Sequence, residues 1–372
     1  MRIVVTGLPL TNRWGIGRYT RSLLHALVRG GGFEVHTLVR SPDPTLPEGI
    51  IQHSLPLPFL NRTLLEQAVI PQVVGRLRPG LYLGADFTLP LRLRTRCAVV
   101  VHDLVPWEAP NSISWRARTL YRTFMPPALE RADLILCDSR RTLRALMERF
   151  SFRREKAVVY PPPLSPLYVD PPRNIPPPDF ALGRHLTGST KLRPYLLYVG
   201  SSAPRKHLPL LVDAFLELHL RGEFDGWLVL AGATLPPPEI RSAPHRPYRP
   251  RMLTEWPVRS LGYVTEQELL SLYAHAELLV HLGHPEGYGY PVAEALAMGL
   301  PCVVPRGSAQ AELGPEGVVE TELELEAVVS ALSEALRRRS ELALEAAREG
   351  KRLRARQPGA ELRAIIDQFL SD

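Results

Sequence analysis

Two glutamates lie close to the glycines Gly287 and Gly289 in HLGHPEGYGYPVAE, residues 281–294. Glu286 belongs to a glycine-rich turn, and Glu294 falls inside the helix predicted to follow it. Glycine lets backbone N–H groups approach a ligand closely, and a helix start adds partial positive charge where a phosphate can bind. The turn carboxylate could stabilise cationic charge at an anomeric carbon, and the helix carboxylate could bind a ribose diol. The alternative is a surface turn before a capped helix.

A pair of cations follows another predicted strand. In YVGSSAPRKH, a glycine turn precedes Arg205 and Lys206 at the predicted start of a helix. Arginine offers a planar fork to phosphate oxygens and lysine a point charge, so the pair could offset the charge that grows on a diphosphate leaving group. A solvated cation pair is the alternative, and the downstream glutamate turn favours the diphosphate.

Two patterns in the first half carry less information. His102 follows the apolar run VVV at the carboxyl end of a predicted strand, which is where α/β folds place ligands; a hydrogen-bonded structural histidine is the alternative. Gly15, Ile16 and Gly17 open the first predicted helix after Trp14. Gly-x-Gly at this place is typical either of a phosphate loop or of a simple tight turn.

The stretch from Glu286 to Glu294 resembles the signature of the family 4 glycosyltransferases, group 1 enzymes of GT-B fold: a Glu-Gly-Phe-Gly-Leu-Pro turn followed by a second glutamate. The resemblance implies two Rossmann-like α/β domains facing each other across a cleft, a nucleoside-diphosphate sugar donor and retention of anomeric configuration. It covers nearly the whole chain and is strongest over residues 195–305. Leu282 and Gly283 stand where the family has Pro-Ser, a departure that concerns the geometry of the loop.

The resemblance also implies roles for individual residues. It makes His102 and Glu286 catalytic at the donor sugar. The implied ligands of the donor diphosphate are Arg205, Lys206, Gly289 and Tyr290. The implied contacts to the donor sugar and nucleoside are Gly287, Tyr288, Glu294, Gly262, Tyr263 and Val264. The implied acceptor-side or phosphate loop is Gly15, Ile16 and Gly17, and residues 86–90 resemble a second acceptor-side loop. His207 replaces the family's asparagine and receives no role.

Composition sets wider limits. The 372-residue chain has a net charge of +7, which suits anionic partners without choosing among them. Its three cysteines lie in separate apolar runs, as expected of buried, reduced thiols. We see no signal peptide and no apolar run of the ~20 residues needed to cross a bilayer, and therefore expect a cytoplasmic protein. Neither zinc-ligand spacing nor an acidic cluster is present, so we expect no metal and no cofactor besides the donor substrate.

Strand-like runs alternate with helical patterns in both halves, which predicts parallel sheets covered by helices. The predicted strands are 2–6, 33–39, 97–101, 134–137, 157–160, 195–199, 227–231, 258–264, 278–280 and 301–304. The predicted helices are 18–28, 140–149, 208–219, 265–274 and 291–298, with two or three more over 322–370 broken near 358–359. A proline-rich segment, residues 161–194, should be extended, and residues 235–257 should form a proline-rich loop.

We divide the chain into four parts on this pattern. Residues 1–165 form an N-terminal Rossmann-like domain on the acceptor side, and residues 166–193 a proline-rich linker. Residues 194–352 form a C-terminal Rossmann-like domain that binds the nucleotide sugar, and residues 353–372 a helix that packs back toward the N-terminal domain.

The family resemblance implies a retaining hexosyltransferase that acts on a glycan, lipid-linked or small acceptor in polysaccharide biosynthesis. The turn after His102 and the Pro-Arg-Lys segment resemble mannosyltransferases and favour GDP-mannose. The mixed basic and aromatic stretch 115–124 could touch the inner membrane surface or a lipid-linked acceptor, or be a solvated helix face. Another GT-B nucleotide-sugar enzyme, such as an epimerase, is one alternative. A basic nucleic-acid-binding protein is another, although no recognition motif supports a nucleic-acid partner.

Overall fold

The computed structural model describes residues 1–11, 15–178, 193–233 and 257–371. Trp14, part of the predicted linker and nearly all of the predicted loop 235–257 lie outside these residues. The chain forms two compact units. The first comprises residues 1–165, 285–288 and 356–372, and the second comprises residues 166–284 and 289–355.

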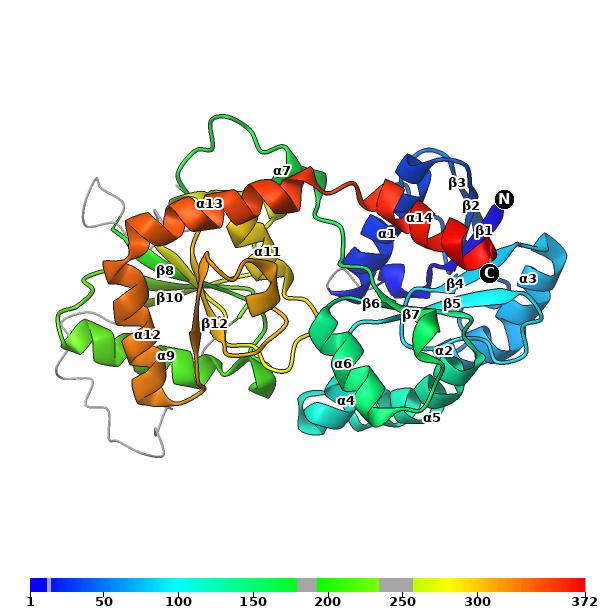
Figure 1. Ribbon diagram of the computed structural model, residues 1–372, viewed down its shortest axis with the longest axis horizontal. Coiled ribbons are helices and arrows are strands. Elements are labelled where there is room, and N and C mark those ends of the chain that lie inside the picture. The colour runs from blue at the N-terminus through cyan, green and yellow to red at the C-terminus, as the bar shows by residue number, and fades with distance from the viewer. Residues whose placement is uncertain (12–14, 179–192, 234–256, 372) are drawn as a thin grey trace. The chain divides into compact units, whose positions relative to one another are not determined.

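The described part of the first unit contains a seven-stranded parallel sheet in the order β3-β2-β1-β4-β5-β6-β7 (Figure 1). Its strands are β1 (Arg2–Thr6), β2 (Glu34–Val39), β3 (Ile50–Ser54), β4 (Leu81–Gly84), β5 (Arg96–Val101), β6 (Leu134–Cys137) and β7 (Ala157–Val159). Its helices are α1 (Ile16–Gly30), α2 (Arg62–Leu64), α3 (Ile70–Leu77), α4 (Val105–Glu108), α5 (Trp115–Arg131), α6 (Arg140–Arg149) and α14 (Pro358–Ser371).

Strand periodicity places a separate apolar core on each face of this sheet. Along β1, Val4 belongs to one buried cluster, while Ile3 and Val5 belong to the other. Successive side chains of a strand point to opposite faces, so a run that is apolar at every position is buried on both. The predicted apolar strands of the first half are therefore strands of a covered sheet, internal except for 157–160, which corresponds to the edge strand β7.

The C-terminal helix α14 lies against α1 in this unit (Figure 1). Leu362 and Ile366 of α14 are fully buried in the same cluster as Ile3. A Cβ on Gly30 would lie 2.5 Å from the carbonyl oxygen of Gly359, so the helices approach this closely because both residues are glycine.

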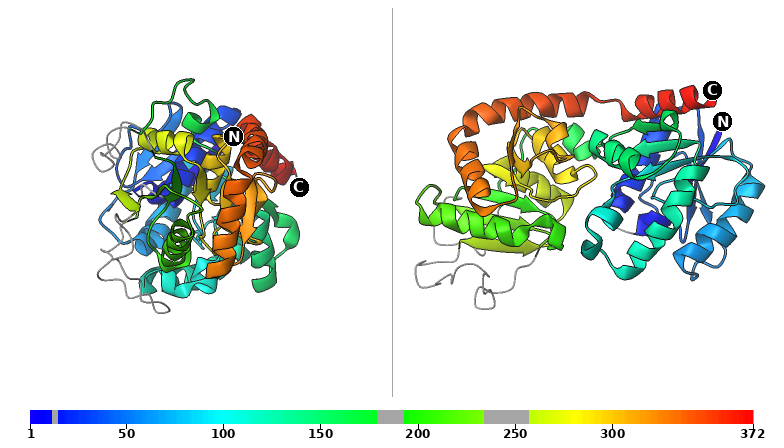
Figure 2. Two further views of the ribbon diagram at one scale, coloured as in Figure 1. Left: turned by 90° about the vertical axis from the view of Figure 1, so that its left-hand side faces the viewer. Right: turned by 60° about the horizontal axis from the view of Figure 1, so that its bottom comes forward.

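The described part of the second unit contains a six-stranded parallel sheet in the order β10-β9-β8-β11-β12-β13. Its strands are β8 (Tyr195–Val199), β9 (Trp227–Ala231), β10 (Val258–Gly262), β11 (Leu278–Val280), β12 (Cys302–Pro305) and β13 (Val318–Thr321). Its helices are α7 (Pro166–Val169), α9 (Leu208–Leu220), α10 (Glu266–His275), α11 (Tyr290–Ala297), α12 (Leu325–Arg337) and α13 (Arg339–Ala355). Figure 2 shows α12 and α13 meeting at a sharp corner.

The predicted alternation of strands and helices is confirmed, and most predicted bounds agree to within two residues. The tail contains three helices, which begin at Leu325, Arg339 and Pro358. One expectation was wrong: the proline-rich segment is not extended throughout, because α7 forms a helical turn that starts at Pro166. Proline fits the first turn of a helix, where its missing N–H has no intrahelical partner.

Candidate functional site

Arg205 and Lys206 lie in a short turn at the carboxyl end of β8. The turn, Pro204–Lys206, is a single 3-10 turn that leads into α9. Lys206 is buried, with 8% of its surface exposed, and its Nζ lies 3.3 Å from Nε2 of the fully buried His281 at the end of β11. Arg205 is half-buried. The predicted cation pair therefore belongs to the same edge of the sheet as the loop that follows β11.

The beginning of the glutamate loop is joined to this turn within the second unit. The backbone N–H of His284 donates to the carbonyl oxygen of Arg205 at 2.9 Å. Nε2 of the buried Gln310 donates to the carbonyl oxygen of Gly283 at 2.6 Å and lies 3.3 Å from Nδ1 of His281. Sequence reasoning missed His281 and Gln310, since neither belongs to the motif that identified the loop.

Gly289 begins helix α11 in a conformation that favours glycine. Its φ is 92°, and a Cβ there would lie 2.5 Å from Cγ of Gln310. Pro291 occupies the first turn of the helix, and Gly299 follows its end with φ 75°, the usual places of these residue types at helix ends. The first turn of α11 thus leaves backbone N–H groups near Tyr290 without intrahelical acceptors, the property on which anion binding at helix starts depends.

Glu294 lies in the interior of α11, as predicted, and is almost completely buried. Its Oε2 accepts a hydrogen bond of 3.0 Å from the hydroxyl of Tyr273 in α10. Tyr273 is itself buried, so the hydrogen bond fixes the orientation of the carboxylate away from bulk water.

The tip of the loop, residues 285–288, is part of the first unit. Gly287 packs against the backbone of His102 so closely that a Cβ would overlap the carbonyl oxygen of that residue. The carbonyl oxygen of Gly287 lies 3.4 Å from Oγ1 of Thr142, which donates to the carbonyl oxygen of His102 at 3.1 Å. The first glycine of the motif is thus required by packing, and Glu286 beside it is half-buried.

His102 lies at the end of β5 with both ring nitrogens engaged. Nδ1 is 2.9 Å from Oδ2 of Asp138, and Nε2 is 3.2 Å from the carbonyl oxygen of Ala85. Burial lowers the pKa of His102, but the adjacent carboxylate outweighs burial and raises the pKa to about 9. A sugar contact through Nε2 would require His102 to leave Ala85. Asp138 was not among the predicted site residues; it directly precedes Ser139, the cap of α6.

A second group of charged residues is formed by Arg62, Glu66 and Asp86, of which Asp86 follows the end of β4. Arg62 forms an ion pair with Asp86, and Oγ1 of Thr88 donates to Oε2 of Glu66 at 2.9 Å. Arg62 Nε lies 3.7 Å from the same carboxylate oxygen of Glu66. Burial raises the pKa of Glu66 above its usual range, although Arg62 opposes this shift. The predicted acceptor-side loop 86–90 therefore carries a network that fixes the Arg62 guanidinium.

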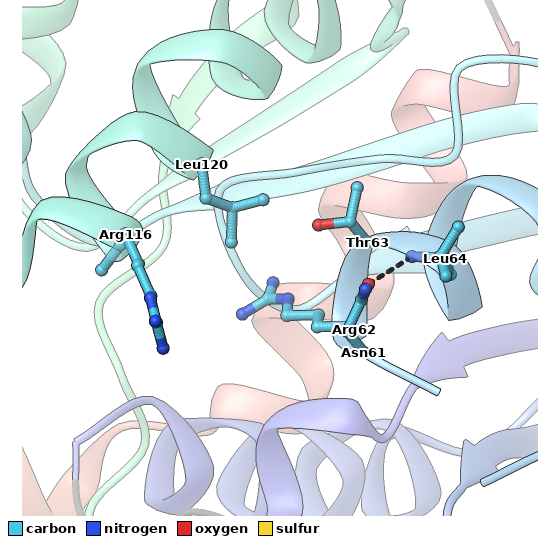
Figure 3. Close-up of a pocket in the computed structure, with 7 residues that line it drawn as sticks. Asn61, Arg62, Thr63, Leu64, Arg116 and Leu120 are labelled. Atoms are coloured by element: carbon cyan, nitrogen blue, oxygen red, sulfur yellow. Dashed lines mark hydrogen bonds between the residues drawn. The ribbon is translucent and has the colours of Figure 1, made fainter. Parts of the chain in front are cut away.

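Arg62 also lines an open pocket of about 510 Å³ between α2 and α5. Figure 3 shows Arg62 and Arg116 extending toward the same space, with Leu120 beside it. Trp115 and Leu64 nearby are 65% and 48% exposed. The pocket thus combines guanidinium groups with apolar surface.

The other predicted residues lie at the ends of elements. Gly15 precedes α1 with φ 44°, Ile16 and the buried Gly17 are the first residues of that helix, and Gly262 ends β10 with φ 66°, followed by the exposed Tyr263. All three cysteines are free and buried. In the described part of the chain, no group of three or more histidine, cysteine or acidic residues could hold a metal ion. Across those residues, no helix is both long and apolar enough to traverse a bilayer.

Comparison with known families agrees with the motif. Residues 193–338 match the model of "Glycosyl transferases group 1", and residues 14–166 match that of "Glycosyltransferase Family 4". The chain belongs to the group 1 glycosyltransferases. This glycosyltransferase is 25% identical over 271 residues to O-antigen chain mannosyltransferase B of Escherichia coli. The match covers 69% of this chain but only 65% of the relative's length.

Solved structures show the fold of this glycosyltransferase. Sucrose-phosphate synthase from Thermosynechococcus elongatus superposes with a TM-score of 0.73 at 18% identity, over 100% of this chain and 99% of that one. Anabaena HepE, solved with UDP and glucose, superposes with a TM-score of 0.66 at 17% identity over 100% of both chains. The predicted GT-B fold is confirmed.

Proposed function

We propose that this protein is a retaining hexosyltransferase that uses a nucleoside-diphosphate sugar. The observation that carries the proposal is the place of Lys206 and of the start of the glutamate loop, residues 281–284, next to strands of the second sheet. They follow β8 and β11, the neighbouring strands at which the strand order reverses. Parallel α/β sheets bind ligands outside the carboxyl ends of their strands at such a reversal.

The chemistry of these residues matches the parts of the donor. Arg205 and Lys206, with the backbone N–H groups of Gly289 and Tyr290, would bind the diphosphate and offset the charge that develops as it leaves. Gly287, Tyr288 and Glu294, with the turn Gly262, Tyr263 and Val264, would contact the sugar and nucleoside. Glu286 would stabilise positive charge at the anomeric carbon, with His102 as the second catalytic group.

The anomeric configuration would be retained if the acceptor attacks the same face of the donor sugar from which the diphosphate departs. The bond from the anomeric carbon to the β-phosphate oxygen breaks as the acceptor oxygen bonds to that carbon, and the departing phosphate oxygen takes the acceptor proton. This route needs no metal and no cofactor, so activity should survive chelation by EDTA. NMR of the product should show the donor's anomeric configuration; an inverted product, or epimerised sugar formed without acceptor, would contradict the proposal.

For the donor we favour GDP-mannose, because the motifs resemble those of mannosyltransferases and the Escherichia coli relative is named as one. The Anabaena structure contains UDP and glucose, so UDP-glucose is the competing donor. Thermal unfolding with GDP, UDP or ADP distinguishes them, since a ligand that binds the folded state raises its apparent stability. The largest increase with UDP or ADP would contradict the choice of GDP.

For the acceptor we propose a glycan or lipid-linked molecule met at the cytoplasmic face of the membrane. The exposed Trp115 beside Arg116, and the lack of any acidic residue from 109 to 129, suit an anionic surface. The protein should sediment with vesicles containing anionic lipid, and Trp115→Ala should reduce the bound fraction severalfold. If both proteins sedimented equally, or neither sedimented, the proposed membrane contact would be contradicted. The proposed transferase activity would be unaffected.

A further inference from the structure

His281 is a buried histidine whose chemistry the glutamate motif does not use. It ends up beside Lys206 because β8 and β11 are adjacent in the sheet. Its ring stacks on that of Tyr198 with 6.4 Å between centroids and an interplanar angle of 12°. Its backbone N–H donates to the carbonyl oxygen of Val303 at 3.0 Å. The backbone and the ring are therefore each held by a protein contact, independently of any ligand.

The contact with Lys206 determines the role of one ring nitrogen. A lysine ammonium only donates hydrogen bonds, so Nε2 of His281 must be the acceptor. Nδ1, the other ring nitrogen, lies 3.3 Å from Nε2 of Gln310. A ring that accepts at Nε2 carries no proton there, so His281 draws Nζ of Lys206 toward itself without adding a second positive charge.

Gln310 connects this pair to both ends of the glutamate loop in the second unit. Its Nε2 holds the carbonyl oxygen of Gly283, and its side chain fills the space that a Cβ of Gly289 would need. Lys206, His281 and Gln310 thus form one buried row from the cation turn to the start of α11.

We propose that His281 is a positioning residue that fixes the ammonium group of Lys206 for binding the donor diphosphate. The inference rests on the proposed function, and it makes His281 act through Lys206 rather than on the substrate. Removing the acceptor nitrogen should therefore weaken diphosphate binding only while Lys206 is present.

The test is a double-mutant cycle on nucleoside diphosphate affinity, measured by calorimetry with GDP, UDP and ADP. H281L removes the acceptor and should weaken binding about tenfold. H281Q offers an amide oxygen to Lys206 and should stay within about threefold of wild type. The double variant H281L/K206A should bind no more weakly than K206A alone. His275→Ala is the control: Nδ1 of His275 lies 3.0 Å from the carbonyl oxygen of Ser271 in the same helix, and the variant should match wild type.

Circular dichroism and the urea midpoint establish that each variant is folded. If H281L does not fold, the variant His281→Met takes its place in the double-mutant cycle. The role of His281 would be overturned if the affinity losses of H281L and K206A added in the double variant, or if H281L bound nucleotide as tightly as wild type. Neither result would contradict the proposed transferase activity. Failure of the wild-type protein to bind any of the three nucleotides would instead overturn the proposed function.

Discussion

Nδ1 of His102 lies 2.9 Å from Oδ2 of Asp138, and both side chains are buried in the first unit. With Asp138 ionised, both ring nitrogens face acceptors, because the second partner is the carbonyl oxygen of Ala85. Such a ring carries protons on both nitrogens. The pair is therefore a buried ion pair, in which the aspartate outweighs the effect of burial on the histidine.

This pair predicts a loss of stability at alkaline pH. The pKa of His102 is raised from 6.5 to about 9 in the folded protein, so its contribution is complete below pH 6.5 and disappears as the pH rises through 9. The contribution is at most about 3 kcal/mol, and the raised pKa of Asp138 offsets part of it. Urea unfolding at pH 6 and pH 9.5 measures it. Asp138→Asn should remove most of the difference; an unchanged difference would show that another group causes it.

Tyr273→Phe tests the buried hydrogen bond to Glu294. Loss of the hydroxyl leaves Oε2 of Glu294 without this donor and should cost about 1–3 kcal/mol of unfolding free energy. Nucleotide affinity should also fall severalfold, because the carboxylate is no longer oriented. Tyr195→Phe is the matched control: it removes a buried hydrogen bond of 2.7 Å to the carbonyl of Leu272 and should reduce stability but not affinity. Equal nucleotide affinity of Tyr273→Phe and wild type would refute the proposed role of Glu294.

Gly359→Ala tests the contact between α14 and α1. The new Cβ would lie 2.7 Å from the backbone nitrogen of Gly30 and 2.8 Å from the carbonyl of Ala26, so we expect a loss of about 1–3 kcal/mol. Gly75→Ala, in α3 with no atom within 4 Å of the new Cβ, should instead stabilise by about 0.5–1 kcal/mol. Urea midpoints measure both. If the two variants changed stability alike, the close approach of the helices would be wrong.

His207 adopts left-handed backbone angles, φ 49° and ψ 32°, between the cation turn and α9. Asparagine tolerates this conformation well, which gives a physical reason for the family's asparagine at this place. His207→Asn should change stability by less than about 0.5 kcal/mol, while the β-branched His207→Val should cost about 1–2 kcal/mol. Denaturant unfolding provides the comparison. A valine variant as stable as the asparagine variant would contradict the strained backbone.

Local patterns predicted much of the fold because their causes are local. Helix Arg140–Arg149 has the predicted bounds, and the helix predicted from 265 begins with a capping box in which both hydrogen bonds between Thr265 and Glu268 are present. Strands β3, β4 and β13 were not predicted. β4 is only four residues long and ends in Gly84, so its short apolar run has too little periodicity to indicate a strand. Its pairing with β1 joins distant parts of the chain, which a local pattern does not reveal.

The partners of site residues were harder to predict for the same reason. Asp138 follows His102 by 36 residues, and Gln310 follows His281 by 29. Neither spacing has a period that marks a contact, since only the order of strands in the sheet brings the residues together. The glutamate motif was recognisable because its parts are contiguous, whereas the groups that orient them come from other strands and helices.

The most direct test of the account is donor turnover by purified wild-type, Glu286→Ala and Lys206→Ala proteins, each supplied with the nucleotide sugar that the wild type uses. We expect each substitution to lower kcat at least about 100-fold, because each removes charge that stabilises the transition state. The matched controls are Glu322→Ala and Lys351→Ala, which replace exposed residues. Both variants should turn over donor at the wild-type rate. Near-normal rates in both site variants would contradict the account.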